Sequence, residues 1–154
     1  MTSEPNTNRI VCQGLSINKD GEFCHEGVEI THPGTVSMLF KNFDRDESGT
    51  YFVQVGCEWA AVEVEAAPYV VKAVREQPDG LVLILSDGSQ EMLGSDGLWI
   101  SGENVLHCRV RNGKFPARFS RPAYYQIADH IEQSKGGAFV IRFAGQTLVI
   151  RPCE

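Results

Sequence analysis

The stretch of this sequence with the most evident chemistry is a run of five basic residues uninterrupted by Asp or Glu: Arg109, Arg111, Lys114, Arg118 and Arg121. Arginine binds carboxylates and phosphates through paired N–H donors. Arg121 immediately precedes Pro122, near the start of an expected helix, where backbone N–H groups and the helix dipole favour anions. If a small anionic ligand is bound, we expect it near Arg118 and Arg121. The alternative, which the sequence favours, is a hairpin whose outward arginines pair with nearby carboxylates.

A second candidate group, Glu58 and Trp59, follows a turn expected at Gly56. We expect both residues to contribute to ligand binding, because a carboxylate beside an aromatic ring at a turn is well placed for it. A small enzyme that uses Glu58, His32 or Cys57 is the alternative function. No partner acid or base for these groups can be identified in the sequence. We therefore favour a non-enzymatic binding or interaction module and assign no catalytic residue.

Histidine and cysteine occur together at only two places, Cys24-His25 with His32 nearby, and His107-Cys108. A zinc site needs four ligands that converge tetrahedrally. Neighbouring residues on a strand point to opposite faces, so only one member of each adjacent pair could reach a common site. Buried thiols and hydrogen-bonded imidazoles are the simpler interpretation, and we expect no metal.

The segment from Asp44 to Gly49 imitates the start of an EF-hand calcium loop, with Asp46 and Ser48 at ligand spacing. The twelfth position of such a loop carries a bidentate Glu, and here it is Val55. An acidic turn between a helix and a strand is the simpler interpretation. The sequence also lacks the nucleophile elbow, the phosphate-binding glycine loop and the zinc-protease motif, so we expect no cofactor.

Composition excludes several partners. The 154 residues carry a formal net charge of −6 and a sequence pI near 5.2, which argues against nucleic acid and against anionic membranes. The polar segment 1–8 has no apolar core of a secretory signal, and no apolar run approaches the roughly 20 residues that span a bilayer. We expect a cytoplasmic protein with reduced thiols, because an odd number of cysteines without a CxxC pair does not suit a disulfide framework: Cys12, Cys24, Cys57, Cys108 and Cys153.

The elements that would position these residues occur twice. The sequence pattern is the same in residues 22–65 and in residues 109–151. Each segment is predicted to form two short strands, a helix that begins at a proline, and a hairpin of alternating apolar residues. The prolines are Pro33 and Pro122, and Thr31 and Ser120 are the expected capping hydroxyls. The two apolar helix stripes are displaced by 88 positions, and their members are Val36, Leu39, Phe40, Phe43 and Tyr124, Ile127, Ala128, Ile131. We infer an internal duplication.

The remaining segments complete a single predicted domain. Residues 1–9 are expected to form a disordered tail, residues 10–154 one domain, and residues 69–105 a β-meander between the halves. The predicted fold class is α+β, a mostly antiparallel sheet with two short amphipathic helices. So many short antiparallel strands leave unpaired edges, and we therefore expect that the protein could form a homodimer.

Several of these residues resemble a bacterial family of uncharacterised proteins. They form an aspartate-glycine-aromatic strand at Asp20, Gly21 and Phe23, the proline-started helix, and the stretch Val62 to Tyr69. Arg118, Arg121 and Tyr124-Tyr125 resemble its second block, whereas Phe23 and Ala66 stand where that family has Trp and Asp. The resemblance implies an α+β fold of two related halves in a soluble bacterial protein, with a suspected ligand-binding or signalling role and no settled activity.

Overall fold

The computed structural model describes residues 14–94 and 97–152, and the tail expected at residues 1–9 lies outside this range. The chain forms two compact units, Met1–Ala66 (unit 1) and Ala67–Glu154 (unit 2). The single domain expected over residues 10–154 stays a prediction.

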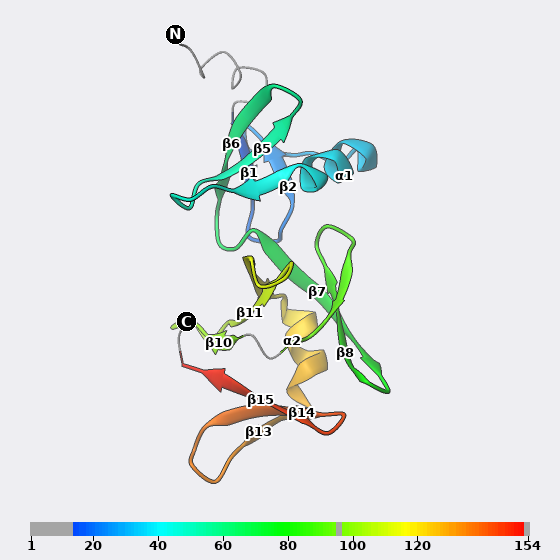
Figure 1. The fold of residues 1–154 in the computed structure, drawn as a ribbon, viewed down its shortest axis with the longest axis vertical. Helices are drawn as coiled ribbons and strands as arrows, with labels where there is room; N and C mark the ends of the chain where they lie inside the picture. Colours follow the sequence, from blue (N-terminus) through cyan, green and yellow to red (C-terminus); the bar gives the residue numbers. More distant parts are fainter. Residues whose placement is uncertain (1–13, 95–96, 153–154) are drawn as a thin grey trace. The chain divides into compact units, whose positions relative to one another are not determined.

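Unit 1 is built on a six-stranded sheet of order β3-β2-β1-β6-β5-β4 with one helix (Figure 1). Its elements are β1 (Leu15–Ile17), β2 (Phe23–His25), β3 (Val28–Glu29), α1 (Pro33–Lys41), β4 (Phe43–Arg45), β5 (Tyr51–Val55) and β6 (Glu58–Val64). The first and last strands of the unit, β1 and β6, are neighbours in the sheet and run parallel. All the other neighbouring strands are antiparallel. The core is aromatic: Phe23 packs edge-on against Phe40 and Phe43, with ring centroids 4.8 and 5.9 Å apart.

Unit 2 contains a nine-stranded sheet of order β13-β14-β15-β10-β11-β12-β7-β8-β9 and the second helix. Its elements are β7 (Tyr69–Gln77), β8 (Gly80–Leu85), β9 (Gln90–Met92), β10 (Leu98–Ile100), β11 (Leu106–Val110), β12 (Phe115–Phe119), α2 (Arg121–Ala128), β13 (Ile131–Gln133), β14 (Phe139–Phe143) and β15 (Gln146–Arg151). Two pairs are parallel, β10 with β15 and β7 with β12. The sheet is thus mixed but mostly antiparallel, and the predicted α+β class is confirmed.

Strand order confirms the internal duplication. Read from β12, part of the unit 2 sheet has the order β12-β11-β10-β15-β14-β13, which repeats β3-β2-β1-β6-β5-β4 strand for strand. Both halves contain one parallel pair at the same place, β1 with β6 and β10 with β15. The strands β7, β8 and β9 extend only the second copy, beyond β12.

A strand outside the predicted boundaries begins each copy, since β1 and β10 precede residues 22 and 109. The turns that follow them correspond in detail. The amide of Asn18 donates to the Glu22 carbonyl at 3.0 Å, and the amide of Ser101 donates to the Val105 carbonyl at 3.0 Å. The third turn position has a positive φ in both, 83° at Gly21 and 64° at Asn104. The strand Leu98–Ile100, expected in the meander, therefore belongs to the second copy.

α1 begins at Pro33 as predicted, α2 begins at Arg121, one residue before Pro122, and one of the two caps differs from the prediction. Ser120 accepts a hydrogen bond from the Ala123 amide at 3.3 Å, as expected. In α1 the capping residue is His32, whose Nδ1 accepts from the Thr35 amide at 3.2 Å, and the assignment to Thr31 is wrong. A histidine nitrogen can replace a hydroxyl here because the cap requires only an acceptor within reach of the third amide of the helix.

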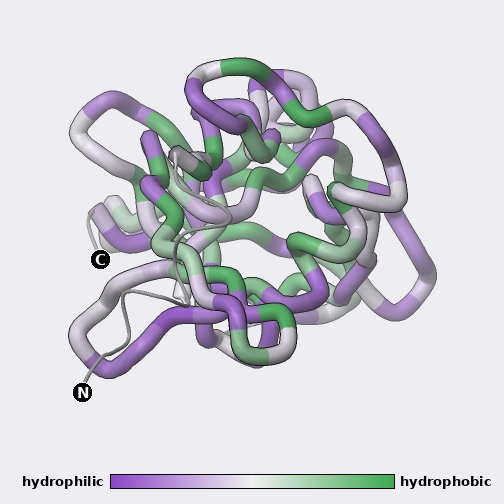
Figure 2. The backbone as a smooth tube through the Cα atoms, turned by 90° about the horizontal axis from the view of Figure 1, so that it is seen from above, coloured by the Kyte–Doolittle hydropathy of each residue, from purple (hydrophilic) through white to green (hydrophobic). Residues whose placement is uncertain are grey.

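The apolar stripes explain how the helices are held. Leu39 and Phe40 are buried in α1, and Ile127 is completely buried in α2. Figure 2 shows that hydrophobic and hydrophilic residues alternate along the described part of the chain. Phe43 and Ile131, the last members of the stripes, lie in β4 and β13, because each helix ends before them. Within the described residues, neither helix has the length or apolar character needed to cross a bilayer.

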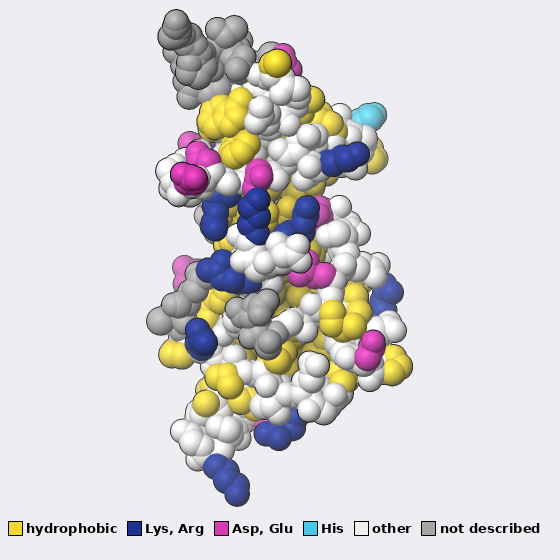
Figure 3. Space-filling view, in the orientation of Figure 1, with side chains coloured by type: hydrophobic (Ala, Val, Ile, Leu, Met, Phe, Trp, Pro, Cys, Tyr) yellow, Lys and Arg dark blue, Asp and Glu magenta, His cyan; other side chains and the backbone are white. Residues whose placement is uncertain are grey.

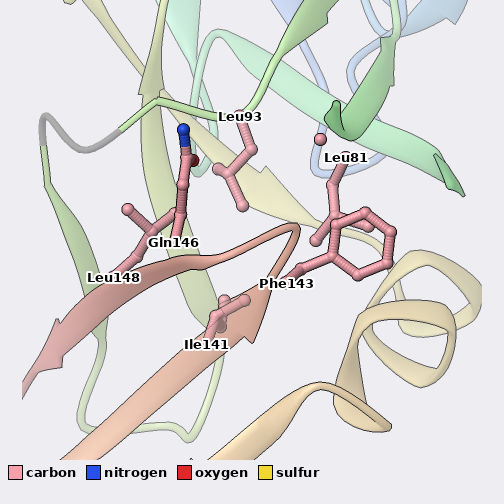
Figure 4. Close-up of a pocket in the computed structure, with 7 residues that line it drawn as sticks. Leu81, Leu93, Ile141, Phe143, Gln146 and Leu148 are labelled. Carbon is pink, nitrogen blue, oxygen red and sulfur yellow. The ribbon is translucent and has the colours of Figure 1, made fainter. Parts of the chain in front are cut away.

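Strands far apart in the unit 2 sheet also meet through side chains. Leu81 and Leu93 lie close to Ile141, Phe143 and Leu148, and the space left between them is only about 10 Å³ (Figure 4). Such a space holds about one water molecule at most. This space between the side chains is therefore too small for a ligand.

Candidate functional site

The described residues of unit 2 place four side chains in one row on the outward side of the sheet. Trp99 of β10 pairs with His107 of β11 and with Arg151 of β15, and His107 pairs with Arg118 of β12. Paired residues on adjacent strands project from the same face of a sheet. On the opposite face, the paired positions Leu98, Cys108 and Ala117 are at most 1% exposed and belong to the core.

Arg109, two residues after His107 on β11, lies on the same outward side, and its guanidinium carbon is 5.8 Å from the Trp99 ring centroid. We call the set Trp99, His107, Arg109, Arg118 and Arg151 the basic face. The described outward positions of β10, β11, β12 and β15 hold no Asp or Glu. Figure 3 shows several Lys and Arg side chains, in dark blue, on one face of the molecule.

His107 is fixed at the centre of this face. Its ring stacks on Trp99 with centroids 5.3 Å apart and planes 7° apart, and its Nδ1 lies 2.9 Å from the Val105 carbonyl. Burial lowers the pKa of His107 below its ordinary value; the Val105 hydrogen bond opposes this shift, and the Arg118 guanidinium adds to it. The imidazole is therefore neutral at pH 7, and the positive charge of the face comes from arginine.

Arg111 of the basic run has a structural role. Its Nη1 donates to the Tyr69 hydroxyl at 3.1 Å and to Asp87 Oδ2 at 3.3 Å, and its backbone amide donates to Glu91 at 3.0 Å. These bonds join the β11–β12 turn to β7 and to the turn after β8. For Arg111, the alternative of an arginine paired with carboxylates is therefore the one observed.

An open hollow of about 450 Å³ adjoins the basic face, since Arg109 contributes to its lining. The rest of the lining comes from residues 89–92, from Gly94 and Gly97, and from the turn after β11, including Arg111. The hollow contains both hydrogen-bond donors and the Glu91 carboxylate. A second open hollow, of about 690 Å³, lies in unit 1 beside Cys24, Glu63 and Glu65, and its acidic lining does not suit an anion.

The predicted site residue Arg121 is the first residue of α2 and is exposed. The helix start is largely satisfied by Ser120, which accepts the amide of Ala123 through its side chain and that of Tyr124 through its carbonyl. Pro122 has no N–H to donate. The geometry therefore favours the basic face over the start of α2 as an anion site, and the role predicted for Arg121 stays untested.

The other predicted pair belongs to unit 1. Glu58 and Trp59 are adjacent in β6, Glu58 is exposed, and Trp59 stacks on Phe52 with centroids 5.6 Å apart. Among the described residues, no hydrogen bond joins Glu58 to His32 or Cys57. His32 already uses Nδ1 for the α1 cap, and Cys57 is exposed at the β5–β6 turn. The three groups of the enzyme alternative are thus not connected.

The calcium-like loop is a self-contained turn. Asp46 Oδ1 accepts hydrogen bonds from the Ser48 amide, the Ser48 hydroxyl and the Thr50 amide at 2.7 to 2.9 Å, and these bonds lower the pKa of Asp46. The carboxylate therefore serves to fold the turn. Over residues 14–94 and 97–152, no group of three or more His, Cys, Asp or Glu side chains could hold a metal ion.

The three described cysteines differ in the accessibility of their thiol groups. Burial raises the pKa of Cys108 to about 12, and burial, followed by the nearby Glu22, raises that of Cys24. Cys57 is exposed. In a Cys12→Ser/Cys153→Ser background at pH 8, we expect one thiol per chain to react rapidly with a thiol reagent and two more only after denaturation. Mass spectrometry of the labelled peptides measures this, and rapid labelling of Cys108 in the folded protein would contradict it.

Comparisons with known proteins identify a family and a fold. Residues 13–138 match the model of a family described as "Protein of unknown function (DUF2946)". A DUF1285 family protein from Silicibacter pomeroyi DSS-3 has a similar structure, with a TM-score of 0.74, 19% identity, and coverage of 90% of this chain and 80% of that one. For a DUF1285 family protein from Shewanella baltica OS155 the TM-score is 0.62, the identity 18%, and the coverage 75% and 91%. No curated protein matches. At these identities the two structures establish similarity of fold alone.

Proposed function

The chain belongs to this family of proteins of unknown function, and from that premise we propose that it is a non-enzymatic module that binds a small anionic ligand on the basic face of unit 2. The observation that carries the proposal is that Arg109, Arg118 and Arg151 share one side of the sheet with Trp99 and His107, on four adjacent strands. A protein with a net charge of −6 otherwise repels anions, so a local group of arginines is informative.

The surroundings of these arginines support anion binding. Trp99 is only 8% exposed and His107 is half-buried, so a bound anion would contact surface of lower polarity than bulk water. Charge interactions are stronger in such surroundings. The strands are also fixed by their ladder hydrogen bonds, which lowers the conformational entropy lost when a ligand binds.

The predicted site residues enter this proposal unequally. Arg118 is a member of the basic face, whereas Arg121 lies at the start of α2 and Glu58 and Trp59 belong to unit 1. Trp99, His107 and Arg151 were not among the predicted ligand residues. The alternation of His107 with Arg109 was visible in the sequence, but Arg151 reaches this group only through the parallel pairing of β15 with β10.

A thermal-shift experiment at constant ionic strength tests the proposal. We expect phosphate, sulfate or a polycarboxylate such as citrate to raise the unfolding temperature of the wild-type chain above that in chloride. A ligand at about 100 times its Kd stabilises the folded state by about 2.7 kcal/mol. Constant ionic strength is needed because salt alone screens repulsion within an acidic protein.

Three variants locate the effect. Arg118→Gln should abolish most of the anion-dependent shift, and Arg75→Gln, on an exposed part of β7 outside the basic face, should preserve it. Arg121→Gln distinguishes the two anion sites, since loss of the shift in this variant alone would place the ligand at α2. Absence of stabilisation by every anion in the wild-type chain would end the proposal.

Self-association is a separate prediction, and the geometry supports it only weakly. The edge strands are β3 and β4 in the unit 1 sheet and β9 and β13 in the unit 2 sheet. Each has two or three residues. Short edges limit strand addition between chains. Light scattering across a concentration series measures the mass, and a constant monomer mass would exclude the homodimer.

A further inference from the structure

The inference concerns the second ring nitrogen of His107. A carbonyl oxygen can only accept a hydrogen bond, so the 2.9 Å contact between Nδ1 and the Val105 carbonyl requires the proton to be on Nδ1. Stacking on Trp99 fixes the plane of the ring. Nε2 lies on the other edge of the imidazole and keeps its lone pair in the neutral ring.

Within residues 14–94 and 97–152, Nε2 is an acceptor without a protein donor. No hydrogen bond from the described residues reaches this atom, although the ring is half-buried and Arg118 is its cross-strand neighbour. The positive charges around the ring disfavour a proton on Nε2, so that this nitrogen stays an acceptor. Arg109 on the same strand and Arg118 on β12 are both cationic, and β10 contributes the uncharged Trp99. A second positive charge on His107 is therefore disfavoured.

The basic face thus offers two kinds of contact within one group of side chains. The guanidinium groups of Arg109, Arg118 and Arg151 are donors for a negative charge, and Nε2 of His107 accepts a proton-bearing group. A simple carboxylate or a fully ionised phosphate satisfies only the first kind. A ligand that also carries a hydroxyl satisfies both.

We propose that the ligand of the basic face is a hydroxylated small anion, which places its acidic group among the arginines and donates its hydroxyl to Nε2 of His107. This inference rests on the anion-binding function proposed above. A hydrogen bond to an otherwise unpaired, half-buried acceptor is expected to strengthen binding about tenfold relative to the analogue that lacks the hydroxyl.

The experiment compares matched pairs of anions by titration calorimetry and thermal shift with the wild-type chain. Malate with succinate, and lactate with propionate, form the carboxylate arm. Glycerol 3-phosphate with propyl phosphate forms the phosphate arm. Within each pair the hydroxylated member should bind about tenfold more tightly. The arm with the larger stabilisation identifies the acidic group that the arginines prefer.

His107→Phe is the matched variant, because it keeps a flat ring against Trp99 and removes the acceptor. We expect it to lose the preference for the hydroxylated member of each pair. Near-ultraviolet circular dichroism reports whether the Trp99 environment survives, and His107→Leu provides a second variant that removes the acceptor. A hydroxyl preference that persists in a folded variant would overturn the inference.

The two proposals fail in different ways. If the wild-type chain is stabilised equally by the hydroxylated and unhydroxylated members of every pair, the role of His107 is wrong and the anion site remains. If neither member of any pair stabilises the wild-type chain, the anion site itself is wrong and the inference falls with it.

Discussion

Replacing Ile127 by alanine is expected to lower the free energy of unfolding of unit 2 by about 2–5 kcal/mol. Ile127 is 0% exposed and is the penultimate residue of α2, a helix of eight residues. So short a helix is marginal by itself and depends on its packing against the sheet. The truncation removes buried apolar surface and leaves a cavity that a well-packed core fills only partly.

Urea unfolding followed by tryptophan fluorescence measures this effect. The chain has two tryptophans, Trp59 in unit 1 and Trp99 in unit 2, so a Trp59→Phe background makes the signal specific to unit 2. Tyr125→Ala is the matched control in the same helix, because Tyr125 is 63% exposed and should cost no more than about 0.5 kcal/mol. Equal effects of the two truncations would show that α2 is not held by this face.

The duplication extends this expectation to unit 1. Leu39 is the counterpart of Ile127 and is 3% exposed in α1. Leu39→Ala, followed by Trp59 fluorescence in a Trp99→Phe background, should destabilise unit 1 by a similar amount.

After Ile127→Ala, the largest effect is expected for Arg111→Ala, which should destabilise unit 2 by about 2 kcal/mol. The Asp87 side chain is 7% exposed and Tyr69 is 0% exposed, and both accept hydrogen bonds from the same Nη1. Truncation leaves a nearly buried carboxylate without its cation. The effect falls short of that of a fully buried ion pair because 43% of the Arg111 side chain is exposed, and water can partly replace it.

A double-mutant cycle isolates the interaction. Asp87→Asn keeps the side-chain oxygen that accepts from Ser89 but loses the charge, so the Arg111→Ala substitution should cost less in that background. Both wild-type Arg and alanine sit at the same positive φ of 57°, so backbone strain largely cancels from the comparison. An Arg111→Ala effect below about 0.5 kcal/mol would mean that the carboxylates do not need this guanidinium.

Local patterns determined much of the fold. The prolines placed both helix starts to within one residue, and the period-two alternation placed β5, β6, β14 and β15. The constant spacing of the apolar stripes showed that the unit occurs twice. These features depend on residues within a few positions of one another, because turn conformation, helix starts and strand alternation are short-range properties.

Two local predictions failed for identifiable reasons. The Thr31 cap was wrong because a histidine one residue nearer to the helix offered an acceptor in better position. The copies were drawn one strand too short because β1 and β10 join them through parallel pairing with β6 and β15, which sequence patterns do not show.

The sequence by itself determined that Arg109, Arg111 and Arg118 are close together and free of intervening acids, and it could not separate their roles. Only the tertiary structure decided that Arg111 binds Asp87 and Tyr69 while Arg109 and Arg118 join Trp99, His107 and Arg151. The physical reason is that sheet pairing brings together strands that are far apart in the chain. The parallel pairing of β10 with β15 cannot be recognised from the local periodicity of either strand.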